Sequence, residues 1–330
     1  MRHRVMALAA LTAAVAAFGT TNASADPYDA QLAGRPVSTS FVFAPLFLPG
    51  EVDVSLLGAS EAELATAGPT ASARPADGPG ILIVDDDGAD CPNAGYTSIQ
   101  AAVTASGNGA RIRVCPGTYA EQVDIGPGHD GLTLFSEQPR RAVIKAPLVM
   151  SDPGDIVRVH GARDVTLSRF TIAGPLPDSL FCSLQTRTGV RIDEGGSATL
   201  RDNVITEIRS TSPALRGCQN GIGVLVGRQS AAQVGTATIT HNRIELYQKG
   251  AIVVDNAGSY AQIDHNQIVH GPPDAIPIAP NGVQVSRGAG AKVQNNVVTE
   301  NTGAALGTGI LVFQAGTGLV AIEHNKVYRN

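Results

Sequence analysis

The chain has 330 residues, a formal net charge of −5, 37 glycines and no tryptophan. A mild excess of acidic residues argues against nucleic-acid binding and leaves no surplus positive charge for an anionic membrane. After residue 25 no apolar stretch approaches the ~20 residues that a membrane-spanning helix needs. We therefore expect neither nucleic acid nor a membrane as a partner.

Residues 1–25 have the pattern of a secretory signal peptide. Two arginines precede an apolar run from Val5 to Phe18, and Ala23-Ser24-Ala25 fits a small-residue cleavage site. This pattern predicts a secreted, extracellular protein. Residues 26–80 are predicted to be an N-terminal extension that ends in an Ala/Pro/Gly-rich linker.

Residues 81–125 begin with a short apolar strand, ILIV, followed by an acidic loop. Asp85, Asp87, Gly88 and Asp90 read D-x-D-G-x-D, and their oxygen atoms would suit calcium. An EF-hand is excluded because Tyr96 stands at the twelfth position, where that loop has glutamate. The alternative is a solvated turn. We expect no cofactor, with calcium as the weaker possibility.

The next segment, YTSIQAAVTAS, predicts a short helix, because Ile99, Ala102 and Val103 form one apolar side. The sequence ARIRVCPGTYAEQVDI then predicts two strands around a Pro-Gly turn.

Four cysteines follow the signal segment. Export and an even number of cysteines favour two disulfides, and we predict the pairs Cys91–Cys115 and Cys182–Cys218. A zinc site built from all four is the alternative, although no C-x-x-C pair is present.

From residue 189 onward the sequence repeats itself in five segments aligned on one asparagine. Successive asparagines are 39, 24, 30 and 29 residues apart, and apolar residues stand three positions before and two after each. The asparagine column is Asn203, Asn242, Asn266, Asn296 and Asn325. Apolar residues at strand spacing on both sides of a turn predict an all-β parallel β-helix with stacked turn asparagines. Leucine-rich repeats are excluded because their leucine framework is missing.

A solenoid exposes an apolar end and unpaired backbone, so it needs an atypical terminal unit. We predict that 81–125 is this N-terminal cap and that 154–330 contains the repeat coils. The sequence stops at EHNKVYRN, midway through a coil, without a C-terminal cap. We expect missing coils or an oligomer partner to cover that end.

The segment YTSIQAAV…IRVCPGTYAEQV, together with the HN-x-[IV] coils, resembles the pectin-lyase-like superfamily of right-handed parallel β-helices. The resemblance covers about 81–330 and implies a single-stranded right-handed solenoid with a short capping helix. In active relatives the substrate groove lies on the outer face of the first sheet, which here would be the G-[AIV]-x-[VI] strands. The Gln-Asp-Thr-Leu sequence of pectin methylesterases and the Gly-His-Gly of polygalacturonases are absent.

The outward positions of the early strands predict a column of arginines. The predicted catalytic residues are Arg158, His160, Arg191 and Asp193, and the predicted substrate-binding residues are Arg111 and Arg113. Arginine forks suit carboxylates, as uronic-acid polymers present them. In a β-elimination His160 or Asp193 would be the base, and an arginine would neutralise the carboxylate. The alternative is a set of ordinary solvated residues on an exposed strand.

His241, His265 and His324 share a column beside the turn asparagine, but Asp202 and Asn295 interrupt it, so we expect no metal there. We expect a secreted β-helix that recognises an extended acidic polysaccharide, and its catalytic form would be a lyase or epimerase. A non-catalytic structural or surface-interaction scaffold is the alternative.

Overall fold

The structure is a computed structural model that describes residues 80–178, 186–272, 278–303, 307–315 and 319–330. The chain divides into two units, Met1–Gly68 and Pro69–Asn330, and every described residue belongs to the second. The predicted signal peptide and the extension up to residue 79 lie outside the described residues and stay predictions. No helix in the described part of the chain is long and apolar enough to cross a membrane.

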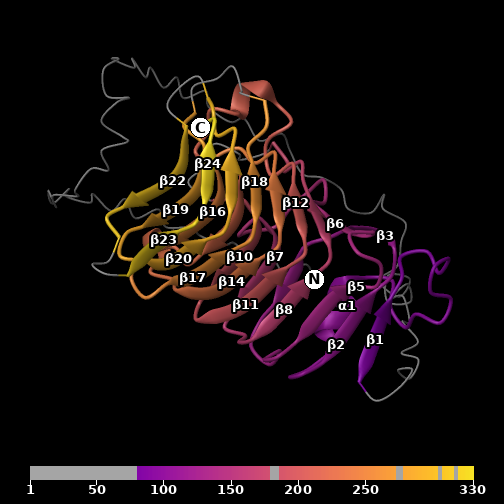
Figure 1. Cartoon of the computed structure of the whole chain (residues 1–330). Coiled ribbons are helices and arrows are strands. Elements are labelled where there is room, and N and C mark those ends of the chain that lie inside the picture. Colours follow the sequence, from indigo (N-terminus) through magenta and orange to yellow (C-terminus); the bar gives the residue numbers. More distant parts are fainter. Residues whose placement is uncertain (1–79, 179–185, 273–277, 304–306, 316–318) are drawn as a thin grey trace, which may run out of the picture. The chain divides into compact units, whose positions relative to one another are not determined.

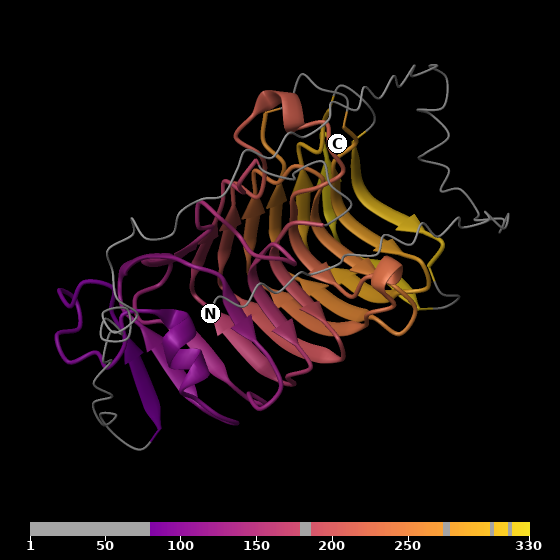
Figure 2. The ribbon, with the colours of Figure 1, turned by 180° about the vertical axis from the view of Figure 1, so that it is seen from behind.

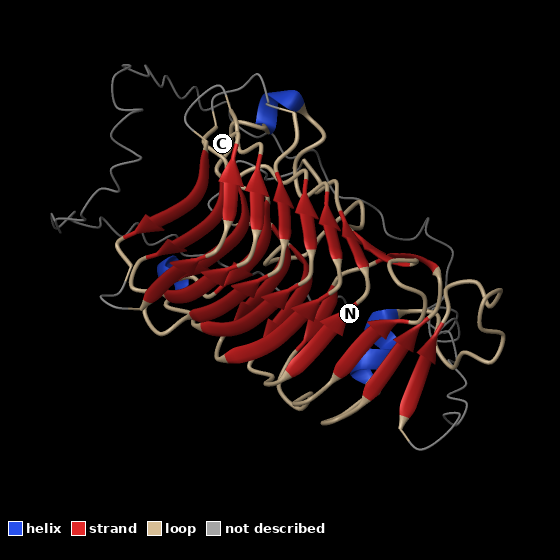
Figure 3. Cartoon of the chain, viewed as in Figure 1, coloured by secondary structure: helices blue, strands red, loops and turns tan. Residues whose placement is uncertain are grey.

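The described part is built almost entirely of strands that lie parallel to their neighbours, coil upon coil (Figures 1 and 3). The nine-stranded sheet contains β1 (Ile81–Val84), β2 (Arg111–Val114), β5 (Thr133–Ser136), β8 (Val165–Ser168), β11 (Gly196–Arg201), β14 (Gly235–Thr240), β17 (Tyr260–Asp264), β20 (Gly290–Gln294) and β23 (Val320–Glu323). The seven-stranded sheet contains β4 (Val123–Ile125), β7 (Asp155–His160), β10 (Thr188–Asp193), β13 (Ile222–Val226), β16 (Gly250–Asp255), β19 (Asn281–Ser286) and β22 (Thr308–Phe313). The eight-stranded sheet contains β3 (Gly117–Ala120), β6 (Ala142–Lys145), β9 (Thr171–Ala173), β12 (Val204–Thr206), β15 (Arg243–Glu245), β18 (Gln267–Val269), β21 (Val297–Thr299) and β24 (Lys326–Tyr328). The all-β parallel β-helix is confirmed.

Each full coil contributes one strand to each sheet, and equivalent residues of successive coils are in register. Leu200, Ile239, Ile263 and Val293 pair in this way across β11, β14, β17 and β20, and all four are completely buried. Apolar columns of this kind fill the interior between the three sheets. Burial of each such side chain contributes about 1.5–3 kcal/mol relative to exposure.

The turn asparagines form the predicted ladder inside the solenoid. From Asn203 to Asn325 each amide nitrogen Nδ2 donates to Oδ1 of the next asparagine, over 3.1, 3.1, 2.9 and 2.9 Å. At the start of the ladder the buried Phe170 takes the asparagine position, and its N–H donates to Asn203 Oδ1 over 2.9 Å. The ladder satisfies polar groups that would otherwise be costly to bury.

The residue before each ladder asparagine has a left-handed backbone, with φ between 54° and 61° at Asp202, His241, His265, Asn295 and His324. Histidine, asparagine and aspartate adopt this conformation more readily than most residues. The histidine column therefore follows from backbone geometry. The rings of His241 and His265 stack with centroids 5.0 Å apart.

The N-terminal part contains the predicted helix, α1 (Ile99–Thr104), which packs against β1, β2 and β4 (Figure 2). Ser98 caps it, and the Glu121 carboxylate accepts hydrogen bonds from the N–H groups of Ile99 and Gln100 over 2.8 and 2.9 Å. That α1 closes the end of the solenoid as a cap stays a prediction. Two short 3₁₀ helices, η2 (Pro213–Leu215) and η3 (Gln229–Ala231), lie in later turns.

The disulfide Cys91–Cys115 is present as predicted, which excludes the zinc site built from all four cysteines. Cys182 lies outside the described residues, so its pairing with Cys218 stays a prediction.

Candidate functional site

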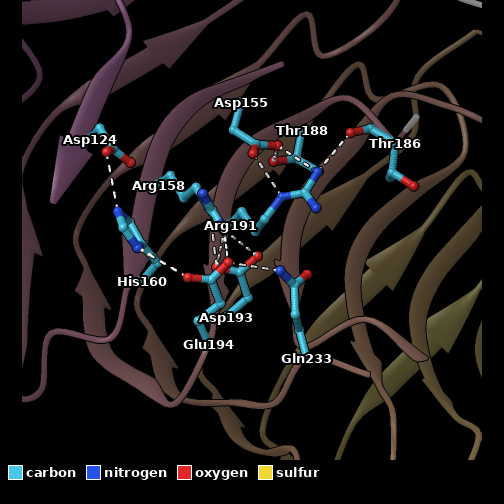
Figure 4. Close-up of polar contacts among 10 residues, drawn as sticks. All are labelled: Asp124, Asp155, Arg158, His160, Thr186, Thr188, Arg191, Asp193, Glu194 and Gln233. Atoms are coloured by element: carbon cyan, nitrogen blue, oxygen red, sulfur yellow. Dashed lines mark hydrogen bonds and ion pairs between the residues drawn. The ribbon is translucent and has the colours of Figure 1, made fainter. Parts of the chain in front are cut away.

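The outer face of the seven-stranded sheet carries a cluster of charged side chains near β4, β7 and β10 (Figure 4). Parallel register places Asp124 beside Arg158, Arg158 beside Arg191, and His160 beside Asp193. The alternate residues of these strands point into the core: Val157, Val159, Val190 and Ile192 are completely buried. The structure therefore brings all four predicted catalytic residues together.

Arg158 is the centre of the first ion-pair network. Its Nε and Nη2 donate to the two oxygens of Asp193 over 3.1 and 3.2 Å, and Nη2 also donates to Glu194 Oε1 over 2.7 Å. Gln233 Nε2 donates to the same Glu194 oxygen over 2.9 Å. The guanidinium fork is therefore occupied by carboxylates of the protein itself.

The two carboxylates differ because their surroundings differ. Burial raises the pKa of Asp193, whose side chain is 0% exposed, although the hydrogen bond and charge of Arg158 oppose this. Burial would also raise the pKa of Glu194, but this side chain is 45% exposed, and Arg158 and His160 hold its pKa below the usual range. Asp193 is thus a poorly accessible base.

His160 lies between two carboxylates. Its Nε2 is 3.1 Å from Asp124 Oδ2, and its Nδ1 is 3.3 Å from Glu194 Oε2. Each ring nitrogen is therefore within hydrogen-bond distance of a carboxylate of the protein. In this arrangement both ring nitrogens of His160 already face carboxylates of the protein.

Arg191 forms a second ion pair beneath the first. Its Nε lies 2.7 Å from Asp155 Oδ2, its Nη2 donates to Asp155 Oδ1 over 2.9 Å, and both side chains are 1% exposed. Thr188 Oγ1 also donates to Asp155 over 2.6 Å, and Thr186 O accepts from Arg191 Nη2 over 2.7 Å. Burial raises the pKa of Asp155, with the charge of Arg191 opposing it. The Arg191 side chain is therefore not accessible to a ligand in this geometry.

A pocket of about 190 Å³ opens beside β4 and the start of β7. The Gln122 side chain fixes one wall, because its Nε2 donates to the carbonyl oxygens of Ser151 and Asp155 over 3.1 and 3.0 Å. Leu148 and Val149 are 96% and 84% exposed in the loop that supplies this wall. The pocket is lined by Gln122, Val123, Asp124, Ser151, Asp152, Pro153, Asp155 and Arg158.

The predicted arginine column is wrong at its N-terminal end. Arg111 and Arg113 lie on β2 in the nine-stranded sheet, whereas Arg158 and Arg191 lie in the seven-stranded sheet. Arg111 packs over the ring of Phe135 at 5.6 Å, and Arg113 pairs with Glu137 at 3.4 Å. Alternation of apolar residues shows that a segment is a strand, but it does not show which of three sheets receives it.

The sequence did not predict several residues of this cluster and its pocket, namely Asp124, Asp155, Glu194 and the loop around Ser151. The segment VDI shows no repeat signature, so its register with the later VRVH was not visible. Glu194 lies in the turn after β10 and not on a strand. The acidic sequence DEGG directly after the predicted Asp193 was the one available signal for it.

A metal ion has no evident place in this cluster, because arginines or His160 already pair with its carboxylates. In the described residues, two groups of acidic or thiol side chains lie close enough to share a metal, and neither is here. They are Cys91, Cys115 and Glu137, whose sulfurs form the disulfide, and Asp85, Asp86 and Asp87.

Residues 155–330 match the family model described as a right handed beta helix region, and the chain belongs to that family. This match supplies the handedness and confirms the right-handed parallel β-helix as the fold. No curated protein matches the chain.

Several solved structures resemble the chain in fold at low sequence identity. A pectin methylesterase from Aspergillus niger is 15% identical, with a TM-score of 0.41 and coverage of 78% of this chain and 93% of that chain. The pectate lyase Pel9A is 15% identical, with a TM-score of 0.46 and coverage of 79% of each chain. The alginate lyase AlyGC, of the PL6 family, is 10% identical, with a TM-score of 0.38 and coverage of 76% of this chain and 39% of that chain.

Proposed function

We propose that this chain binds an extended polysaccharide along the outer face of the seven-stranded sheet. The observation that carries the proposal is the polar pocket at Asp124, Asp155 and Arg158, open on a face where successive coils present side chains in register. Neighbouring parallel strands are about 4.8 Å apart, so such a face can contact a polymer at several points along its length. The pectate lyase and alginate lyase of similar fold are consistent with this partner.

The polymer is recognised mainly through its hydroxyl groups. Both arginine forks on this face already donate to Asp155, Asp193 and Glu194, so they offer little to the carboxylates of a uronate chain. The pocket wall instead contains the exposed carboxylates of Asp124 and Asp152 beside one arginine, whereas the Asp155 carboxylate is buried against Arg191. Carboxylates accept strong hydrogen bonds from hydroxyl donors. The expected preference for an acidic polymer is therefore disfavoured by this geometry.

Catalysis stays a prediction. A lyase or epimerase needs an unprotonated base that reaches the substrate, and a cation that faces its carboxylate. Here His160 uses both nitrogens and Asp193 is buried against Arg158. Turnover would require these ion pairs to open when substrate binds. The same closed network favours the second candidate, a non-catalytic scaffold that contacts other macromolecules.

Binding is tested by affinity electrophoresis or calorimetry of the secreted chain against neutral glucans, mannans and xylans and against pectate and alginate. We expect at least one hydroxyl-rich polymer to bind, and Asp124→Asn to weaken it about tenfold through loss of a charge-assisted hydrogen bond. Arg111→Ala, on a different sheet, is the matched control and should bind as wild type.

Ultraviolet absorbance of newly formed unsaturated ends and release of reducing sugar, followed in parallel, report turnover. Absence of binding to every polymer, with the folded protein in hand, would reject the proposal and leave the scaffold. Turnover of a uronate polymer would restore the acidic-substrate prediction.

A further inference from the structure

Three consecutive aspartates directly after β1 form a carboxylate cluster away from the candidate site. One carboxylate oxygen each of Asp85, Asp86 and Asp87 lies within 4.8 Å of the other two. Within the described ranges, no lysine, arginine or histidine forms an ion pair with any of the three. Three negative charges at this separation repel one another unless a cation compensates them.

Asp85 provides an independent indication of a missing ligand. The residue is 1% exposed, and its Oδ2 accepts a hydrogen bond from the Cys91 N–H over 2.5 Å. Its other oxygen, Oδ1, is buried and has no hydrogen-bond partner. Buried polar atoms are almost always paired, and an unpaired carboxylate oxygen is especially unfavourable. A cation bound beside Asp85 would remove this cost by pairing with the carboxylate.

The cluster is held in place from two segments of the chain. Asp86 Oδ2 accepts from the Thr118 N–H at the start of β3 over 2.9 Å, and Asp87 Oδ1 accepts from the Ala89 N–H over 2.8 Å. A Cβ at Gly117 would lie 2.2 Å from Asp86 Oδ1, so glycine is required for β3 to approach this closely. The disulfide Cys91–Cys115 joins the same two segments. The carboxylates are therefore positioned before any ion binds.

We propose that Asp85, Asp86 and Asp87 bind a divalent cation, with calcium preferred. An all-carboxylate set suits hard cations, whereas zinc and copper favour nitrogen and sulfur ligands. Calcium–oxygen distances of about 2.3–2.6 Å allow oxygens on opposite sides of one ion to be about 4.6–5.2 Å apart. Magnesium, with distances of about 2.0–2.1 Å, requires a tighter and more regular set. The ion would fix the turn after β1, which Asp86 already joins to β3 through the Thr118 N–H.

The test is a terbium titration of the full secreted chain after treatment with a chelator. The chain has no tryptophan, so sensitised emission must come from tyrosine. Tyr119 Oη lies 3.4 Å from the carbonyl oxygen of Val84, the residue before Asp85, so its ring is near the cluster. We expect saturable terbium emission that calcium displaces with half-saturation between about 10 μM and 1 mM, at least tenfold more effectively than magnesium.

Asp87→Asn is the decisive variant, because Asp87 is exposed and its loss should not prevent folding. It should weaken terbium and calcium binding at least tenfold. Asp90→Asn is the matched control, since Asp90 lies in the same loop but outside the cluster, and should bind within about twofold of wild type. Absence of saturable emission from folded wild type, or equal effects of the two variants, would overturn the proposal.

Discussion

Arg191 and Asp155 form an ion pair that solvent barely reaches, with both side chains 1% exposed. Two charges in such a place are tolerated only because each compensates the other, so removal of one leaves the other buried and alone. We expect Arg191→Met to lower the free energy of unfolding by about 3–5 kcal/mol in urea denaturation. The double variant Arg191→Met, Asp155→Leu should lose less unfolding free energy than the single variant. Equal losses would show that the two charges are not coupled. Loss of activity in an Arg191 variant would therefore be weak evidence for catalysis.

Glu194 should make stability depend on pH in a way that can be isolated. Its pKa is lowered in the folded state below the ordinary 4.5, so its contribution is present above that pH and is lost as the pH falls through the lowered value. Because Glu194 is partly exposed, the contribution is about 1 kcal/mol. The free energy of unfolding of wild type, measured by chemical denaturation, should exceed that of Glu194→Gln by this amount at about pH 7. The difference should shrink at about pH 3.

The raised pKa values of Asp155 and Asp193 have the opposite effect on stability, since the contribution of each group to the free energy of unfolding falls as the pH rises. Both carboxylates are present in wild type and in Glu194→Gln, so their effect largely cancels in the difference. A difference that stays constant across this pH range would contradict the prediction for Glu194.

The sequence predicted which residue types occupy the charged cluster. It did not predict how these residues pair with one another. Arg158, His160, Arg191 and Asp193 follow from strand alternation in the segments VRVH and VRID. Burial of Arg191 depends on the turns and loops that surround β10, and these have no repeating pattern. Asp124 and Glu194 decide whether His160 is free, and neither lies in a repeated strand position.

At the scale of the elements, the asparagine ladder joins successive coils through their turns. Asn266 accepts from the backbone and side-chain N–H of Asn242 and donates to Ile239 O, Asp264 O and Asn296 Oδ1. We expect Asn266→Ala to cost about 3 kcal/mol of unfolding free energy, because several buried polar groups lose their partner together. Gln267→Ala, at the exposed neighbouring position, should cost less than about 0.5 kcal/mol. Similar losses for the two variants in urea unfolding would contradict a role for the ladder.

This ladder was predictable because the asparagine, the apolar residue before it and the apolar residue after it recur at fixed spacing in each coil. The sequence did not predict which sheet receives each early strand, and the reason is visible at Arg111 on β2. The first coils have irregular loops and a helix, so their strands cannot be aligned with the later coils by spacing alone.

At the scale of the solenoid, each coil contacts mainly its two neighbours, so stability is close to a sum of local and nearest-neighbour contributions. The disulfide Cys91–Cys115, separated by 24 residues, acts on the first coil only. In the chain-entropy model a loop of this length contributes about 3 kcal/mol. Replacement of both cysteines by serine should therefore loosen the N-terminal coil without unfolding the rest.

Hydrogen exchange followed by mass spectrometry measures this directly. We expect faster exchange in residues 81–125 of Cys91→Ser, Cys115→Ser and little change in β14 to β21, because distant coils keep both of their neighbours. Uniformly faster exchange along the whole solenoid would instead show that the coils unfold as one cooperative unit. The first result would make the N-terminal unit a separable element whose stability can be tuned, by the disulfide or by an ion at Asp85–Asp87, while the later coils keep their structure.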